Sequence, residues 1–529
     1  MLLRAVSSLD EGALQQALAR LVEAELLYQR GLSPQATYLF KHALIQDAAY
    51  QSLLKSTRQQ YHQRIAQVLE AQFPETCATQ PERLAQHYTE AGLLAQALAY
   101  WQQAGQRAIE RSAHAEAVAH LTRALDVLTA LPDTPARDQQ ALDLQTALGP
   151  ALMAVKGQGA PEVGQAYARA RELCQQVGET PQLFPVLFGL WRFYFMHAEH
   201  QTARQVSEQC LALAQRTHDP ALLLPAHFAL AASLIYDRGD YVSARAHLEQ
   251  GIALYEPQAH RGLAARYGID LGVWHRSYAA HTLWMLGYPE QALRRGHEAL
   301  ALARELAHPH SLAAALFYLA MLYQLRREAP ETQAHAEAVL VCASEQGFPQ
   351  WVALGTVYRG WALALQGQGE AGVAQIRQGL DVWRAFGHEL AQNQHLSMLA
   401  EAYGTAGQPA VGVTVVTEAL APPEANSERM WEAGIHRLQG ELLLRLPGDH
   451  DAEAEACFRR ALDVARTQQA RSWELRTAVS LARLWQQHGR GAEAHQLLAP
   501  IYGWFTEGFD TADLQEARAL LKAFGERPS

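Results

Sequence analysis

Residues 399–419 read LAEAYGTAGQPAVGVTVVTEA, and this stretch predicts one antiparallel helical hairpin. Leu399 and Tyr403 are spaced to lie on one face of a first helix. Gly407 permits the left-handed turn that ends this helix, and Gly412 lets the backbone of a second helix approach the first closely. One such hairpin cannot bury its apolar face alone, so the stretch predicts stacking on similar neighbours.

The same pattern recurs along the chain. Aligned copies begin at Leu84, Leu190, Ala279 and Leu481. The small residue of each second helix falls at positions 203, 244, 292, 334, 372, 412, 454 and 494, in steps of about 40 residues. Strand-like alternation is absent from about residue 80 onward, so the pattern predicts an array of helical hairpins.

The repeated phrase resembles the tetratricopeptide repeat in a long-helix form, over roughly residues 80–505. The resemblance implies an all-α, right-handed superhelical solenoid of helical hairpins. The motif is poor over 137–178, and 323–346 lacks the glycine between its helices. A HEAT-like or other helical solenoid is the structural alternative.

The first 70 residues follow another pattern. Helical periodicity covers 11–24, and two short strand-like runs flank a Gly-Leu-Ser-Pro turn at 31–34. Helices are expected at about 43–54 and 57–71. Helix, hairpin and helix in this order are the ending of a winged-helix domain, so we expect the chain to begin inside such a domain.

Four domains are therefore expected. They are a partial winged helix with a β-hairpin over 1–71, the first hairpins or connector over 72–136, the repeats over 137–505, and a capping helix with a tail over 506–529. The capping helix itself is predicted at 511–524.

The stretch FKHALIQDAAY at 40–50 resembles the winged-helix end of signal-transducing (STAND-type) ATPases, which are often fused to adenylate or guanylate cyclase or kinase domains. In some members of that class, a histidine at this junction approaches the β-phosphate of bound ADP. The resemblance implies that His42 senses the nucleotide state. The alternative is that His42 caps or packs the junction between strand and helix.

Composition narrows the function. The chain has 529 residues, 49% of them hydrophobic, and a net charge of −10, which does not suit a nucleic-acid or anionic membrane surface. None of the four lysines, Lys41, Lys55, Lys156 and Lys522, lies in a phosphate-binding Gly-x-x-x-x-Gly-Lys-Ser/Thr loop. We therefore expect no ATPase site, no direct nucleic-acid contact and no catalytic activity.

The expected location is the cytoplasm, away from any membrane. The five cysteines are odd in number and widely spaced, as is typical of a reducing compartment. No signal peptide is evident, and no apolar stretch approaches 18 residues, so we expect no segment that spans a membrane.

Metal and cofactor signals are weak. His197 with His200, and His308 with His310, lie near expected turns and lack the helical i, i+4 spacing and carboxylate of a zinc hydrolase. We expect no metal and no cofactor.

The best candidate site is the concave groove of the solenoid. Carried over to each copy, the inward positions of the tetratricopeptide pattern imply exposed aromatic and cationic side chains. These are Phe188, Arg192, Phe195, Tyr236, Trp274, His281, Trp284, Tyr323, Arg326 and Trp361. Such a groove suits peptide termini, acidic peptides or a planar or sugar-like ligand. The alternative is ordinary core, because an error of one position turns a helical side chain by about 100°.

The sequence thus favours a non-catalytic scaffold or sensor arm of a bacterial signal-transducing ATPase, binding a protein, a peptide or a small-molecule inducer in its groove. An ATPase or cyclase module is expected in the same chain or as a partner. Two alternatives stay open at this point. One is a part of an ATPase or cyclase whose catalytic domains lie elsewhere, and the other is an independent tetratricopeptide adaptor.

Overall fold

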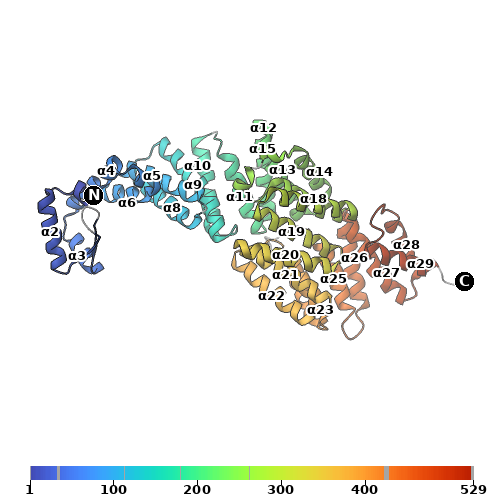
Figure 1. The fold of residues 1–529 in the computed structure, drawn as a ribbon. Helices are drawn as coiled ribbons and strands as arrows, with labels where there is room; N and C mark the ends of the chain where they lie inside the picture. Colours follow the sequence, from blue (N-terminus) through green and yellow to red (C-terminus); the bar gives the residue numbers. More distant parts are fainter. Residues whose placement is uncertain are drawn as a thin grey trace. The chain divides into compact units, whose positions relative to one another are not determined.

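The computed structural model describes residues 2–31, 36–111, 113–178, 180–260, 262–421 and 428–525. This part of the chain is all-α apart from one two-stranded sheet near the N-terminus (Figure 1). It forms two compact units. Unit 1 comprises residues 1–155 and 165–183, and unit 2 comprises residues 156–164 and 184–529.

The elements of unit 1 are α1 Leu2–Val6, α2 Glu11–Glu23, β1 Leu27–Arg30, β2 Thr37–Phe40, α3 Ala43–Gln51, α4 Lys55–Gln72, α5 Pro74–Thr79, α6 Pro81–Ala91, α7 Leu94–Glu110, α8 His114–Thr129, and α9 Pro135–Lys156, which ends one residue inside unit 2. Helix α10 covers Pro161–Val177 and has residues in both units.

The helices of unit 2 are α11 Leu183–Met196, whose first residue is in unit 1, α12 His200–Thr217, α13 Pro220–Arg238, α14 Tyr241–Leu254, α15 Pro257–His260, α16 Leu263–Tyr267, α17 Leu271–Met285, α18 Pro289–Leu306, α19 Pro309–Leu325, α20 Ala329–Gln346, α21 Pro349–Leu365, α22 Gly369–Ala385, α23 Gln392–Thr405, α24 Pro409–Leu420, α25 Glu432–Leu443, α26 Asp451–Thr467, α27 Arg471–Gln487, α28 Gly491–Tyr502 and α29 Ala512–Gly525.

The N-terminal hairpin confirms the two predicted strands. Strand β1 pairs with β2 antiparallel, with Leu27 opposite Phe40. Helix α2 begins after Asp10, whose side chain accepts a hydrogen bond of 2.9 Å from the backbone N–H of Ala13. The predicted turn lies largely outside the described residues, because the description stops at Gly31 and resumes at residue 36.

The segment that holds the hairpin buries little apolar surface of its own. Leu18 and Leu27 are its buried large residues before α4, whereas Leu44 is 80% exposed and Leu54 is 74% exposed. Leu44 is the second residue of α3 and Leu54 precedes α4, and side chains of this kind normally pack against a core. A winged helix in this segment stays a prediction.

Unit 2 is a solenoid in which consecutive helices pair as antiparallel hairpins. The first helices of its hairpins are α11, α13, α17, α19, α21, α23, α25 and α27. Each second helix has a buried small residue at its fourth position, as in Ala292 of α18 and Gly372 of α22. In α20 this residue is Thr332, not the residue at 334, so the predicted marker at 334 is wrong. Thr332 lies 40 residues from both Ala292 and Gly372, which makes the repeat more regular than the sequence suggested.

The turns between paired helices need one residue with positive φ. Gly287, Gly407 and Gly489 occupy this position in three hairpins, with φ of 72–90°. Between α19 and α20 the residue is Arg327, with φ of 65°. The missing glycine in that repeat is therefore replaced by an arginine in the same left-handed conformation.

Successive turns of the solenoid contact one another within unit 2. Segments about 190 residues apart are joined by hydrogen bonds, so that the C-terminal end of one first helix meets the start of another. The backbone N–H of Leu390 donates to the carbonyl of Met196 at 3.2 Å. The Ser472 hydroxyl donates to the carbonyl of Trp284 at 2.5 Å. The interior of the solenoid is thus closed on this side.

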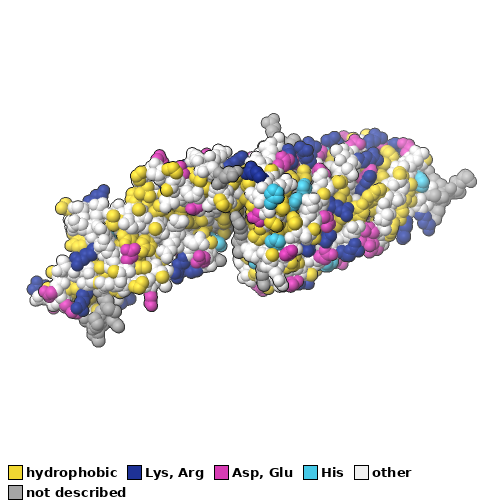
Figure 2. Space-filling model, turned by 90° about the horizontal axis from the view of Figure 1, so that it is seen from above, with side chains coloured by type: hydrophobic (Ala, Val, Ile, Leu, Met, Phe, Trp, Pro, Cys, Tyr) yellow, Lys and Arg dark blue, Asp and Glu magenta, His cyan; other side chains and the backbone are white. Residues whose placement is uncertain are grey.

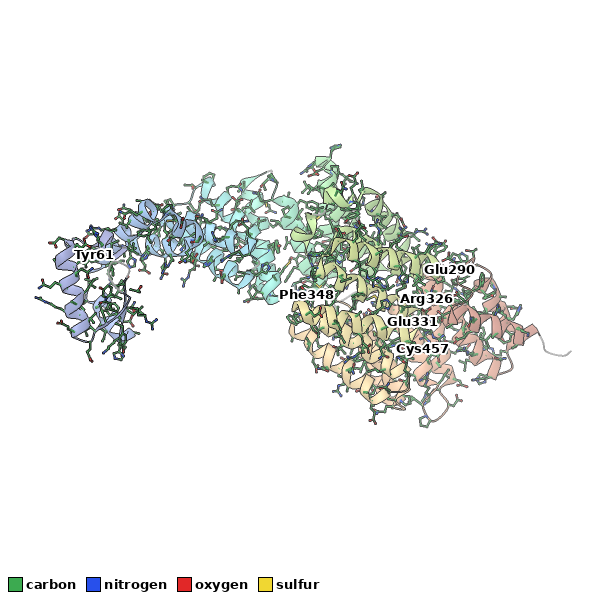
Figure 3. All side chains as sticks on the ribbon, in the orientation of Figure 1. Tyr61, Glu290, Arg326, Glu331, Phe348 and Cys457 are labelled. Carbon is green, nitrogen blue, oxygen red and sulfur yellow. The ribbon has the colours of Figure 1, made fainter. Side chains whose placement is uncertain are left out.

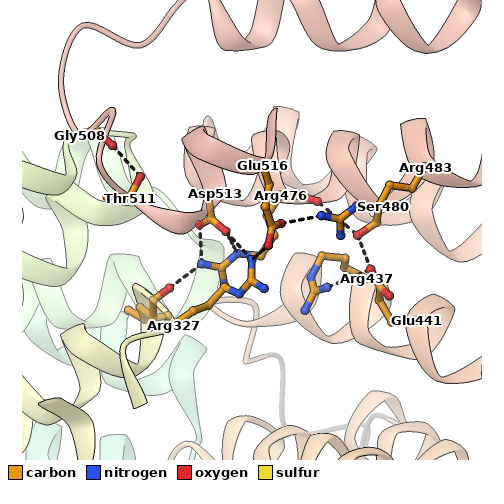
Figure 4. Close-up of polar contacts among 11 residues, drawn as sticks. Arg327, Arg437, Glu441, Arg476, Ser480, Arg483, Gly508, Thr511, Asp513 and Glu516 are labelled. Atoms are coloured by element: carbon orange, nitrogen blue, oxygen red, sulfur yellow. Dashed lines mark hydrogen bonds and ion pairs between the residues drawn. The ribbon is translucent and has the colours of Figure 1, made fainter. Parts of the chain in front are cut away.

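Ion pairs, of which the one between Arg476 and Asp513 is buried, add to this closure (Figure 4). Arg476 of α27 binds Asp513 of α29, and Arg327 at the end of α19 lies 3.3 Å from the same carboxylate. Arg327 and Arg483 also pair with Glu516, each at 3.0 Å. The predicted terminal helix at 511–524 is therefore confirmed as α29, and it closes the core between α19 and α27.

One described helix, α13, is long and apolar enough to cross a membrane, so the expectation that no apolar stretch approaches that length is wrong. Within unit 2 it packs between α12, α14 and α17, and 72% of its apolar stretch is buried. The apolar composition of α13 therefore matches its place in the protein core.

On the face of the molecule seen in Figure 2, basic and acidic side chains are interspersed.

Candidate functional site

A cavity of about 90 Å³ lies inside unit 2. Its wall comes from six first helices, α11, α13, α17, α19, α21 and α23, together with Trp383 of α22 and the segment around His388 and Leu390. Since each of these helices belongs to a different hairpin, the cavity lies at the centre of the solenoid. A cavity of this size has room for several water molecules or a small organic molecule.

Aromatic rings form most of the cavity wall. Phe228 stacks on Trp274, with centroids 4.5 Å apart and planes at 10°, and Tyr278 meets the same Phe228 edge-on at 5.0 Å. Phe317 and Trp351 lie 5.4 Å apart on the side formed by α19 and α21. These contacts pack the rings against one another, so the wall is a preformed apolar surface.

Arg192 brings a positive charge into the wall. Its Nε donates to Gln158 Oε1 at 3.0 Å, and its Nη1 donates to the backbone carbonyl of Tyr267 at 2.5 Å. The guanidinium lies over the ring of Trp274, 5.0 Å from the centroid. Such a contact is favourable in a site shielded from water.

The other titratable groups of the wall are neutral near pH 7. Burial lowers the pKa of His388 to about 4, and the nearby His197 and Arg192 lower it further. Burial likewise lowers the pKa of His395 to about 4. Burial raises the pKa of Tyr278 to about 12. Among the residues that line the cavity there is no aspartate or glutamate, and Arg192 is their one charged side chain.

The structure brings together four of the ten residues expected in the groove. Arg192, Phe195, Tyr236 and Trp274 line the cavity. All ten are buried, with at most 8% of any side chain exposed, so the expectation of an open groove with exposed aromatics is wrong. The physical reason is closure: contacts between turns cover the surface that a short array would leave open.

The other six residues pack outside the cavity wall. Trp284 meets Trp473 edge-on at 5.3 Å, and Trp361 donates from Nε1 to Glu401 at 2.7 Å. His281 Nε2 lies 2.9 Å from the carbonyl of Tyr318. Figure 3 shows Arg326 at the end of α19, where it donates to the carbonyl of Pro289. The remaining two residues pack against aromatic rings. Phe188 packs on Trp191 and Tyr267, and Tyr323 packs on His297 and His335.

His42 lies at the junction of β2 and α3. It is the residue that precedes the first turn of α3, its side chain makes no capping hydrogen bond, and it is exposed. Its position at the surface leaves the nucleotide-sensing role as a prediction.

Neither of the two histidine pairs belongs to a group of side chains that could bind a metal ion. His200 is fully buried against Phe195 and Tyr236, and His308 caps the start of α19 through Ser311. His310 Nδ1 lies 2.8 Å from the carbonyl of Gly268. In the part of the chain that the structure describes, no three His, Cys, Asp or Glu side chains come together as metal ligands.

Sequence reasoning missed the residues contributed by the end of α22, the segment after it and the first turn of α23. Trp383, His388 and His395 line the cavity but do not occupy the inward positions of the tetratricopeptide pattern. Trp383 donates from Nε1 to the carbonyl of Leu390 at 3.2 Å, and its ring lies 4.4 Å from that of His388. The only signal was a cluster of aromatic and histidine residues between 383 and 395.

The fold defines the chain as an all-α helical-repeat protein with a central cavity. No family model matches the chain. The chain is similar to protein R02095 of Rhizobium meliloti (strain 1021), with 26% identity over 491 residues, which cover 91% of this chain and 47% of that protein. The chain thus spans about half the length of that relative.

Two solved structures are similar at low identity. The Rap protein complexed with Competence and Sporulation Factor has a TM-score of 0.44 at 12% identity, covering 77% of this chain and 99% of that chain. The apo form of the quorum sensor NprR from B. thuringiensis has a TM-score of 0.41 at 13% identity, covering 70% of this chain and 99% of that chain.

Proposed function

We propose that this chain is a non-catalytic binding scaffold and sensor, which captures a peptide segment, a protein side chain or a small molecule inside unit 2. The observation that carries the proposal is the central cavity, because its wall is assembled from six different hairpins. A ligand held there contacts all six at once. Small adjustments of each hairpin then add along the solenoid.

The contacts between turns of the solenoid couple ligand binding in the cavity to the arrangement of α27. Trp284 and Leu325 end first helices that contribute to the wall, and their carbonyls accept hydrogen bonds from Ser472 and Arg476 of α27. A ligand that favours one arrangement of the wall therefore also favours one arrangement of the contacts between turns. This coupling is what a sensor arm requires.

The wider role is the arm of a bacterial signal-transducing ATPase that acts in the cytoplasm, with His42 as a nucleotide-state sensor. The similar protein of Rhizobium meliloti is about twice as long, which leaves room for other modules in such proteins. All five cysteines are free thiols, in keeping with a reducing compartment. The second candidate function is a part of an ATPase or cyclase whose catalytic domains lie outside this chain.

Retention from a host extract tests the binding role. The purified chain is incubated with a peptide and metabolite extract and passed through a desalting column, and the retained compounds are identified by mass spectrometry. Leu354→Trp fills the cavity and should abolish retention, whereas Leu354→Met conserves volume and should not. Equal retention by the wild-type and Leu354→Trp chains contradicts the proposal. Turnover of ATP by the purified chain contradicts its non-catalytic part.

A further inference from the structure

Three side chains of the cavity wall carry polar atoms that have no hydrogen-bond partner among the described residues. They are Nε1 of Trp351, both ring nitrogens of His388, and Nδ1 of His395. All three side chains line the cavity, and they are 7%, 4% and 1% exposed. Buried polar groups in native proteins are nearly always paired, and a molecule bound in the cavity would supply partners for these side chains of its wall.

The unpaired groups are rich in donors. The indole of Trp351 only donates, and a neutral imidazole carries one N–H. His388 and His395 are neutral near pH 7, so each imidazole has one N–H donor and one acceptor nitrogen, and the guanidinium of Arg192 adds positive charge beside His388. The complementary group is an acceptor with negative charge and more than one oxygen, and a carboxylate meets both conditions.

A sugar or another polyol fits this wall less well. No aspartate or glutamate lines the cavity, so every side-chain acceptor available to the hydroxyl groups of a sugar is neutral, and hydrogen bonds to neutral acceptors are the weaker ones. A cation is excluded by the same absence together with the charge of Arg192. Water alone fits the polar region but leaves the rings of Phe228, Trp274 and Phe317 against solvent, which is unfavourable for apolar surface.

The rest of the ligand is apolar and small. The stacked rings of Phe228 and Trp274 on one side and the pair of Phe317 and Trp351 on the other present ring faces and edges, to which another ring binds well. The volume of about 90 Å³ suits a molecule with one ring rather than a peptide segment.

Resting on the proposed role of unit 2 as a binding scaffold, we propose that the cavity binds a small aromatic monocarboxylate. The ring lies between the aromatic walls, and the carboxylate accepts hydrogen bonds from Trp351, His388 and His395 near the charge of Arg192. The ligand class is thus set by donors that the folded chain leaves unpaired.

Titration calorimetry with three matched probes tests this class. Phenylacetate carries the carboxylate, phenylacetamide replaces it with a neutral amide, and 2-phenylethylamine carries a positive charge. We expect phenylacetate to bind at least about tenfold more tightly than the amide, because hydrogen bonds to a charged group are the stronger ones. The amine should not bind detectably.

Variants locate the binding site. His388→Leu and Trp351→Phe each remove donors while keeping much of the volume, and each should weaken phenylacetate binding about tenfold. His227→Leu is the matched control: His227 is buried in α13 but does not line the cavity, so its replacement should leave the affinity unchanged. Circular dichroism and thermal melting establish that every variant is folded.

Four results overturn the inference: no binding of phenylacetate, equal binding of acid and amide, binding of 2-phenylethylamine as tight as that of phenylacetate, or carboxylate binding that both cavity variants leave intact. Retention of another compound from the host extract, sensitive to Leu354→Trp, would leave the scaffold role standing while the proposed ligand class fails. If the wild-type chain retains nothing from the host extract but binds phenylacetate, the proposed ligand class stands while the scaffold role fails.

Discussion

Arg476 holds Asp513 in a buried bidentate ion pair. Nε of Arg476 donates to Oδ1 at 2.9 Å and Nη2 donates to Oδ2 at 2.5 Å, across 37 residues of sequence. The same Nη2 also donates to the carbonyl of Leu325 at 2.6 Å. One guanidinium therefore joins α27, α29 and the end of α19, three elements that come together only when the solenoid closes.

We expect Asp513→Ala to destabilise unit 2 by about 3–5 kcal/mol, because it leaves the buried charge of Arg476 unpaired. Urea unfolding measures the change. Arg476→Met combined with Asp513→Leu should recover much of the loss, since a buried ion pair contributes little beyond apolar residues of similar size. Glu493→Ala is the control and should change stability little, because its pair with Arg490 is at the surface. An equal effect of Asp513→Ala and Glu493→Ala would contradict the assigned role.

Acid should destabilise unit 2 through His275. Complete burial lowers the pKa of this imidazole to about 3, from 6.5 in the unfolded chain. Below pH 6.5 the His275 imidazole binds a proton in the unfolded state but not in the folded state. The free energy of unfolding therefore falls as the pH is lowered from 6.5 toward 3. At pH 5 the loss from this one group is about 2 kcal/mol.

His275→Asn isolates that contribution, because asparagine has an N–H that can donate to the carbonyl of Leu271 but does not titrate. Urea unfolding at pH 7.5 and pH 5.0 should show a difference smaller by about 2 kcal/mol in the variant than in the wild type. The same pH difference in both chains would mean that His275 is not the group responsible.

Trp284 is expected to be a stability residue. Its ring meets Trp473 edge-on, and the guanidinium of Arg476 lies over both rings, 5.2 Å and 5.0 Å from their centroids. Trp284→Ala should lower the free energy of unfolding by about 3–5 kcal/mol. A double-mutant cycle with Trp473→Ala should give a coupling of about 0.5–1.5 kcal/mol. Additive effects would show that the two rings act independently.

The sequence could predict the hairpins but not the way in which they close. Helix pairing follows from local spacing and glycine placement. The sequence therefore predicted the hairpins and also the terminal helix α29. The closed interior depends on contacts about 190 residues apart, such as Ser472 with Trp284, and no local period records them. The inward positions of an open array therefore identified Arg192 and Trp274 but missed His388, which lies between helices.

Local rules also failed where one residue type replaced another. Arg327 adopts the left-handed conformation that glycine has in most of the other hairpin turns, and its guanidinium pairs with Asp513 and Glu516. Thr332 fills a position for a small residue by donating its hydroxyl hydrogen bond to the carbonyl of Glu328 at 2.8 Å. Tertiary contacts of this kind are invisible to a pattern of small and large residues.

The closest approach between paired helices gives the last prediction. A Cβ added to Gly360 of α21 would lie 2.8 Å from the carbonyl oxygen of Gly372 of α22 and 2.9 Å from the backbone nitrogen of Ile376. Because these are backbone atoms, the helices must move apart to accept it. Gly360→Ala should therefore destabilise unit 2 by about 1–3 kcal/mol, although alanine favours helix formation.

Gly12→Ala is the control. It lies on the exposed face of α2, where the added Cβ would make ordinary contacts only, and it should be neutral or slightly stabilising. Urea unfolding of both variants checks this, and a stabilised Gly360→Ala would show that α21 and α22 are not packed backbone to backbone.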